Sequence, residues 1–261
     1  MPELEVVLSR GEQLFEPTTR RKFLKVLGVG GTVVMLPSMF TACNDDNSTN
    51  PSDSVFTLDL SNDTGILNYA YALEQLEAAY YTAALASTGF AALTANEQEV
   101  LGDLQKHEVI HREFFKTALG SAAIATLSFN ATTVGTLTAS ATVLLSTSQL
   151  LEDTGVSAYN GAGKYLTNAA NLIVAGKIVS VEARHAAAIR DIRDIRNGNT
   201  GKVFAGDDVV SPTSGLDVKA EPSTVIASVN GLNVVIGTLA IQSGTPDATK
   251  KTADAAAPQP T

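Results

Sequence analysis

Two short motifs combine a carboxylate with an imidazole at a spacing that suits metal binding. Glu108-Val-Ile-His111 and Glu182-Ala-Arg-His185 each place a glutamate three residues before a histidine. Residues three apart lie on the same face of an α-helix. The two side chains of each motif can therefore bind one metal ion, or one ion each of a close pair.

A lone glutamate precedes each motif, and each of these glutamates is followed by a tyrosine at the same spacing. Glu74 is followed by Tyr81, and Glu152 by Tyr159, seven residues later in both cases. Seven residues are nearly two helical turns, so each tyrosine shares a face with its glutamate. The order Glu, Glu-x-x-His, Glu, Glu-x-x-His indicates a duplicated helix pair. It is also the ligand set of a two-metal site in the core of a four-helix bundle.

Apolar residues at helical spacing surround the motifs. Leu104 and Phe115 share the face of the first motif, and Ile178 and Ile189 that of the second. Four buried carboxylates without partners would be costly and would repel one another. Two divalent cations would balance their charge, which favours metal ligands over ordinary solvated glutamates. The predicted ligands are Glu74, Glu108, His111, Glu152, Glu182 and His185.

Three alternatives remain open at this stage. Glu77 also lies on a fairly apolar face and is the reserve for Glu74, although the duplication pairs it with Gly155. Tyr81 and Tyr159 either hydrogen-bond the ligands or simply fill the core. His107-Glu-Val-Ile-His111 reads as the H-E-x-x-H helix of zinc metalloproteases, with Glu108 as general base. That interpretation leaves the second Glu-x-x-His motif unexplained. It also makes His107 a ligand, whereas in the two-metal interpretation His107 lies to one side of the site.

Long helical patterns must position these residues, and we predict an all-α fold. The expected helices span residues 63–87, 95–119, 141–169 and 171–196, and residues 120–140 form a long crossover between the second and third. The expected divisions are a signal region (1–43), a flexible tether (44–56), the helical domain (57–199), a C-terminal extension (200–243) and a disordered tail (244–261). Within the extension, residues 223–230 are expected to form a short helix, and residues 233–241 a strand or an irregular cover.

The N-terminal region has the pattern of an export signal. Thr19-Arg-Arg-Lys-Phe-Leu-Lys25 resembles the twin-arginine signal, and the apolar run from Val26 to Leu36 is too short for a membrane span. Phe40-Thr-Ala-Cys43 resembles a lipoprotein processing site, which would explain the single cysteine by lipidation of Cys43. We therefore expect a protein that is exported by the twin-arginine route and anchored in the cell envelope by lipid alone.

Charge narrows the classes of partner. The chain of 261 residues has a net charge of −9, which argues against nucleic acid. Outside the signal, no stretch has the roughly 18 apolar residues of a transmembrane helix. One core domain is expected, and the sequence leaves a dimer open.

These motifs together resemble the ferritin-like superfamily, in particular its exported bacterial branch related to desiccation-related proteins. The resemblance is carried by residues 68–81, 152–162 and 181–186, and it covers roughly residues 57–197. It implies an antiparallel four-helix bundle with a di-iron or di-manganese site at the six predicted ligands. The expected function is redox chemistry with oxygen, peroxide or ferrous iron, of the ferroxidase, oxidase or peroxidase/catalase type. The alternative is a non-catalytic metal-binding or envelope-protective protein.

Overall fold

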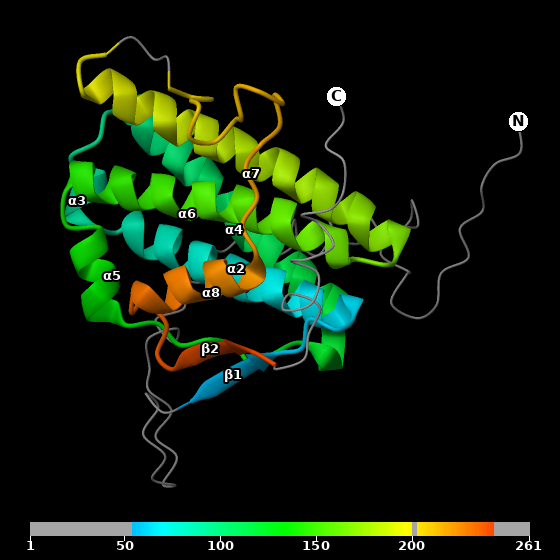
Figure 1. Ribbon diagram of the computed structural model, residues 1–261. Coiled ribbons are helices and arrows are strands. Elements are labelled where there is room, and N and C mark those ends of the chain that lie inside the picture. Colours follow the sequence, from blue (N-terminus) through cyan, green and yellow to red (C-terminus); the bar gives the residue numbers. More distant parts are fainter. Residues whose placement is uncertain (1–53, 200–202, 243–261) are drawn as a thin grey trace, which may run out of the picture.

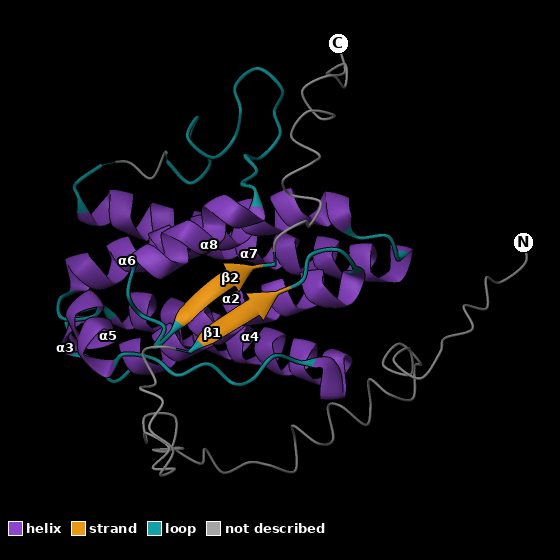
Figure 2. Ribbon diagram, turned by 60° about the horizontal axis from the view of Figure 1, so that its bottom comes forward, coloured by secondary structure: helices purple, strands orange, loops and turns teal. Residues whose placement is uncertain are grey.

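The computed structural model describes residues 54–199 and 203–242. The predicted twin-arginine signal, Cys43, most of the predicted tether and the predicted disordered tail lie outside these residues. Helices make up most of the described chain, together with a pair of short strands (Figures 1 and 2). The all-α expectation is met in its main part.

Four long helices form the body of the molecule. They are α2 (Asp63–Ala84), α4 (Ala95–Leu119), α6 (Ala141–Ala162) and α7 (Ala169–Arg196). In space, α2 packs chiefly on α4 and α6 chiefly on α7, so each pair joins a lone glutamate to a Glu-x-x-His motif. The N-terminal ends of α2 and α7 lie at the same end of the molecule as the C-terminal ends of α4 and α6, on the right in Figure 1.

Capping side chains set the helix boundaries. Thr94 and Glu97 form a reciprocal capping box at the start of α4, which begins and ends where the sequence predicts. Helix α2 ends before residue 87 because Ser87 caps the short helix α3 (Thr88–Ala91). Helix α6 stops at Ala162 and is followed by a 3₁₀ turn, because Asn168 caps α7 by accepting a hydrogen bond from the Ala170 amide.

The crossover between α4 and α6 is tied to α2 by two buried amides. Asn68 accepts a hydrogen bond from the Ile124 amide at 2.7 Å and donates one to the Ala122 carbonyl at 2.8 Å. Gln75 accepts one from the Leu127 amide at 2.8 Å. The segment also contains helix α5 (Ala131–Leu137). These hydrogen bonds hold the crossover against α2 and satisfy two of its backbone amides.

Two parallel strands join the beginning and the end of the described chain. Strand β1 (Val55–Leu58) pairs with β2 (Thr238–Ile241), and both lie on one side of the helices beside α8 (Pro222–Gly231) (Figure 2). Residues 55 and 56, expected in the tether, belong to β1. Its four residues carry too little periodic signal to predict without the partner strand, which lies far along the sequence.

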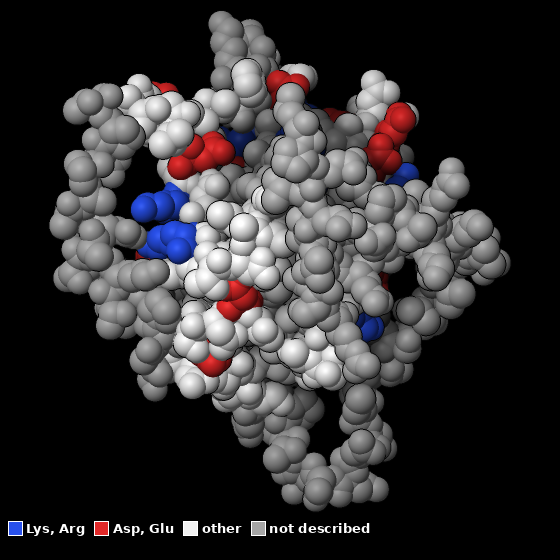
Figure 3. All heavy atoms as spheres, turned by 90° about the vertical axis from the view of Figure 1, so that its right-hand side faces the viewer, with Lys and Arg blue, Asp and Glu red and all other residues white. Residues whose placement is uncertain are grey.

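The main hydrophobic core runs from the helices into the C-terminal extension. Within the described residues, no single helix has the length and apolar composition of a membrane span. Residues Ala131–Leu137 and Ala141–Tyr165 meet those criteria only together, across a bend of 108°. On the face in Figure 3, acidic and basic side chains are interspersed among the described residues.

Candidate metal centre

The structure brings all six predicted ligands together between the four long helices. Helix α2 supplies one glutamate, α6 another, and α4 and α7 a Glu-His pair each. The glutamates are fully buried and the histidines nearly so: Glu74, Glu108, Glu152 and Glu182 at 0%, His185 at 3% and His111 at 8% exposed. Their metal-binding atoms form two groups that share two carboxylates, and within each group these atoms lie within 4.8 Å of one another.

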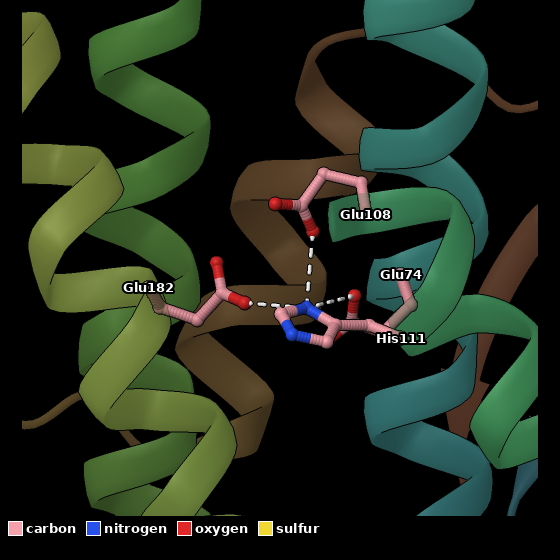
Figure 4. Close-up of side chains that lie close together, drawn as sticks. All are labelled: Glu74, Glu108, His111 and Glu182. Atoms are coloured by element: carbon pink, nitrogen blue, oxygen red, sulfur yellow. Dashed lines mark ion pairs between the residues drawn. The ribbon is translucent and has the colours of Figure 1, made fainter. Parts of the chain in front are cut away.

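The imidazole of His111 faces three carboxylates from three helices (Figure 4). Its Nδ1 lies 2.8 Å from Glu182 Oε1 on α7 and 3.5 Å from Glu74 Oε2 on α2. It is also 3.5 Å from Glu108 Oε2, on its own helix. One nitrogen and three oxygens therefore converge on a single region.

The surroundings of His185 repeat this pattern with the helices exchanged. Its Nδ1 lies 2.8 Å from Glu108 Oε1, 3.4 Å from Glu152 Oε2 and 3.6 Å from Glu182 Oε2. Glu108 and Glu182 thus each direct one oxygen toward each imidazole. The lone glutamate of each half contacts only one imidazole. This is the approximate two-fold symmetry that the duplicated sequence indicates.

Most of the converging atoms lack a hydrogen-bond partner. Among the described residues, the buried atoms without one include Nδ1 of both histidines and both oxygens of Glu108 and Glu182. They also include Oε2 of Glu74 and of Glu152. The short contacts between imidazole and carboxylate therefore do not satisfy these groups. Buried polar atoms left in this state ordinarily mark a missing ion or water, and a cation fits this donor set.

Burial and mutual charge strongly shift the acidity of the cluster. Burial raises the pKa of both Glu74 and Glu152 to about 8. Burial opposes the ionised form of Glu108 too, but the two imidazoles outweigh it and lower that pKa to about 2. Burial would lower the pKa of His185, yet the surrounding carboxylates raise it to about 12. Without metal, the cluster holds protons that a bound cation must displace.

Two tyrosines hydrogen-bond the lone glutamates, and each tyrosine belongs to the other helix pair from its glutamate. Tyr81 on α2 donates a hydrogen bond to Glu152 Oε1 on α6 at 2.6 Å. Tyr159 on α6 donates one to Glu74 Oε1 on α2. Burial raises the pKa of both phenols well above the usual value, so both remain donors. In each glutamate, the oxygen toward the tyrosine is satisfied and the other faces an imidazole.

Glu77 lies beside the cluster without joining either group of converging atoms. It is buried, at 3% exposure, and a Cβ added at Gly155 would lie 3.2 Å from its Oε1. Helix α6 is continuous through Gly155, so this glycine marks close packing and not a bulge. Burial raises the pKa of Glu77 well above its usual value. Glu74, in contrast, belongs to the group of converging atoms around His111.

His107 has a place at the site that the sequence did not indicate. Its Nδ1 lies 2.9 Å from Nε2 of His185, and the two rings are parallel within 4°. A zinc-protease helix would need His107 and His111 on the same ion. His107 is instead exposed and belongs to neither group of converging atoms. Its ring stacks on that of His185, which does belong to one. Only the fold, which sets α4 against α7, reveals this contact.

A comparison with protein-family models matches residues 62–194 to the ferritin-like domain. The match covers just over half of the chain and includes all six residues of the cluster. No curated protein shows a significant match to the chain.

Proposed function

The chain belongs to the ferritin-like domain family, and from this premise we propose that its buried cluster holds two iron or manganese ions for redox chemistry. The reactants would be oxygen, peroxide or ferrous iron. One observation carries the proposal: the unsatisfied atoms of four buried carboxylates and two imidazoles converge as two overlapping groups. We also infer that α2, α4, α6 and α7 form the antiparallel four-helix bundle of this architecture.

The donor set supports this choice of ions. Two divalent cations balance four carboxylates while both imidazoles stay neutral, which removes the repulsion among the carboxylates. Oxygen-rich sites with imidazole and without thiolate suit iron and manganese better than they suit softer metals. When bound, such a pair supplies electron transfer to oxygen or peroxide.

Each residue of the cluster has a role that follows from its position. Glu108 and Glu182, which reach toward both imidazoles, would bridge the two ions. Glu74 with His111, and Glu152 with His185, would each complete the surroundings of one ion. Tyr81 and Tyr159 fix the orientation of the lone glutamates, and the packed inner faces of the helices exclude bulk water. The protein thus orients the ligands in advance and keeps the site dry.

Elemental analysis of natively folded protein tests the proposal. We expect about two iron or manganese ions per chain, the number that two such groups of ligands hold. The Glu108→Ala/Glu182→Ala double variant should lose both, because the bridging carboxylates are gone. Glu99→Ala/Glu113→Ala, at glutamates outside the cluster, is the matched control and should retain them. A folded wild-type protein without metal would rule out the two-metal site, and one zinc that survives loss of Glu182 would favour the protease reading.

The second experiment separates turnover from simple binding. Metal-loaded protein is mixed with oxygen or peroxide, and absorbance and reactant consumption are followed. If the site is a redox centre, the wild type should consume oxygen or peroxide repeatedly, and the double variant should not. Metal that stays bound without consumption would support the non-catalytic, storage or protective alternative.

We further propose export by the twin-arginine route and lipid attachment at Cys43, on the sequence of the N-terminal region alone. Such a route delivers folded protein, so a metal could be acquired before export. Arg20→Lys/Arg21→Lys should leave the protein in the cytoplasm, and Cys43→Ala should release it from the membrane fraction. Cell fractionation with lipid labelling measures both. Unchanged membrane attachment of the Cys43 variant would refute the anchor.

A further inference from the structure

A narrow apolar crevice leads from the surface toward one half of the cluster. Its lining residues come from the end of the molecule where α2 and α7 begin, and its interior volume is about 20 Å³. Leu67, Leu166 and Ala175 at its outer part are half-buried, whereas Phe115 and Tyr159 at its inner part are buried. The crevice therefore has a half-buried rim and a buried inner end.

The inner end lies close to Glu74 and His111. Tyr159, which lines it, donates a hydrogen bond to Glu74 Oε1. Ala70 and Phe115 also line it, one helical turn from Glu74 and His111 respectively. The crevice thus ends against side chains that contact this half of the cluster.

The lining selects the kind of molecule that can enter. Among the described residues, no charged side chain contributes to it. A metal ion would lose its hydration there without compensation, and peroxide would lose hydrogen bonds. The volume is near the minimum that holds one water, and apolar cavities stay dry and bind apolar gases. A small apolar molecule, in contrast, loses no hydrogen bonds on entering.

We propose that this crevice is a binding site and access path for dioxygen. Its role as a path to the metal ions rests on the proposed function, whereas binding of the gas does not. Dioxygen is the one candidate reactant that matches the lining. Ferrous iron and peroxide must then reach the cluster by another way.

Binding is tested on metal-free protein by NMR under oxygen pressure, because dissolved dioxygen relaxes nearby methyl signals. Leu73 lines the crevice, whereas Leu101 is also buried and does not. The methyl signals of Leu73 should relax faster than those of Leu101. Ala175→Phe, which fills the crevice, should abolish the difference. Ala170→Phe, at a half-buried alanine of α7 outside the crevice, should preserve it. Equal relaxation of Leu73 and Leu101 in the wild type would overturn the proposal.

The path is tested on anaerobic, ferrous-loaded protein by stopped-flow. Ala175→Phe should slow oxidation by dioxygen about ten-fold and leave oxidation by peroxide and the metal content unchanged, while Ala170→Phe leaves all three unchanged. Ala175→Leu fills less space and serves if the larger variant fails to fold. An undiminished rate with dioxygen in a folded Ala175 variant would overturn the path. A wild type that does not react with dioxygen would overturn the path, and one that reacts with neither dioxygen nor peroxide would overturn the proposed function as well. The NMR result decides in either case whether the gas binds.

Discussion

At the scale of single residues, the site depends on which oxygen of each carboxylate is already occupied. Oε1 of Glu74 and of Glu152 accepts a hydrogen bond from a tyrosine on the opposite helix pair. Oε2 of each has no hydrogen bond and lies near an imidazole. The tyrosines thereby restrict rotation of the carboxylate and aim the free oxygen. Orientation of this kind typically changes metal affinity without removing a ligand.

Replacement of either tyrosine by phenylalanine should therefore weaken metal binding while preserving the ligand set. Tyr81→Phe and Tyr159→Phe should each lower metal affinity by about ten- to a hundredfold, as loss of such outer partners does. Competition with a chelator, followed by elemental analysis, measures this change. Tyr80→Phe is the matched control, because its hydroxyl donates to the Leu144 carbonyl at 2.7 Å and does not hydrogen-bond a glutamate. An equal loss of affinity in that control would contradict the orienting role.

The residues of the cluster are predictable from sequence because they obey helical geometry. A Glu and a His three apart must share a face, and the duplication supplies the rest of the set. His107 is different, because its partner, His185, lies on another helix and only packing brings them together. Likewise, the sequence indicates that Tyr81 and Tyr159 share a face with their own helix's glutamate. It does not indicate that each donates to the glutamate of the other pair.

At the scale of elements, the helices can be predicted from the sequence, whereas the contacts between elements cannot. The apolar period and the Thr94–Glu97 capping box locate α4, whereas α6 ends early because Asn168 starts the next helix. Strand β1 exists only because β2 pairs with it. Asp63 makes a further contact between elements that are distant in sequence. Its carboxylate on α2 accepts hydrogen bonds from the Thr167 and Asn168 amides at 2.8 and 3.0 Å, so it joins α2 to the start of α7.

Asp63 should make part of the stability depend on pH. Burial would raise its pKa, but hydrogen bonds from Thr167, Asn168 and Asn171 outweigh this and hold it below its usual value of 3.8. The stabilisation is therefore complete above pH 3.8 and disappears as the pH falls through the lower, folded-state pKa. Asp63→Asn should cost about 1 kcal/mol at pH 7, a modest value because solvent reaches the carboxylate.

Urea unfolding of both proteins at pH 7 and near pH 3 measures this difference. The gap between wild type and Asp63→Asn should shrink at the lower pH. Asp103→Asn removes an exposed pair with Lys106 and should change little at either pH. A gap that stays constant with pH would show that Asp63 does not act through its charge.

At the scale of the whole molecule, the C-terminal extension belongs to the same core as the helices, although the family match ends at residue 194. Six of its apolar residues are buried there: Val225, Ile226, Val229, Val234, Val235 and Leu239. Glu221 adds polar ties, since it accepts hydrogen bonds at 2.6 Å from both Lys164 and Tyr165. The Ala220 amide also donates to the Ser157 carbonyl of α6 at 2.9 Å.

A chain that ends at Asn199 should therefore fail to form a stable site, although it retains every residue of the cluster. Each buried aliphatic side chain contributes about 1.5–3 kcal/mol, and a domain has only about 5–15 kcal/mol in total. We expect a low or non-cooperative thermal transition by calorimetry, and loss of metal by elemental analysis. A chain that ends at Gln242 keeps every described element and should unfold as the full chain does. If the shorter chain melted at the same temperature with its metal bound, the extension would be an appendage to a self-sufficient helical domain. The core that runs into α8 and β2 argues against that outcome, because removing them exposes the side of α6 that α8 covers and leaves β1 without its partner strand.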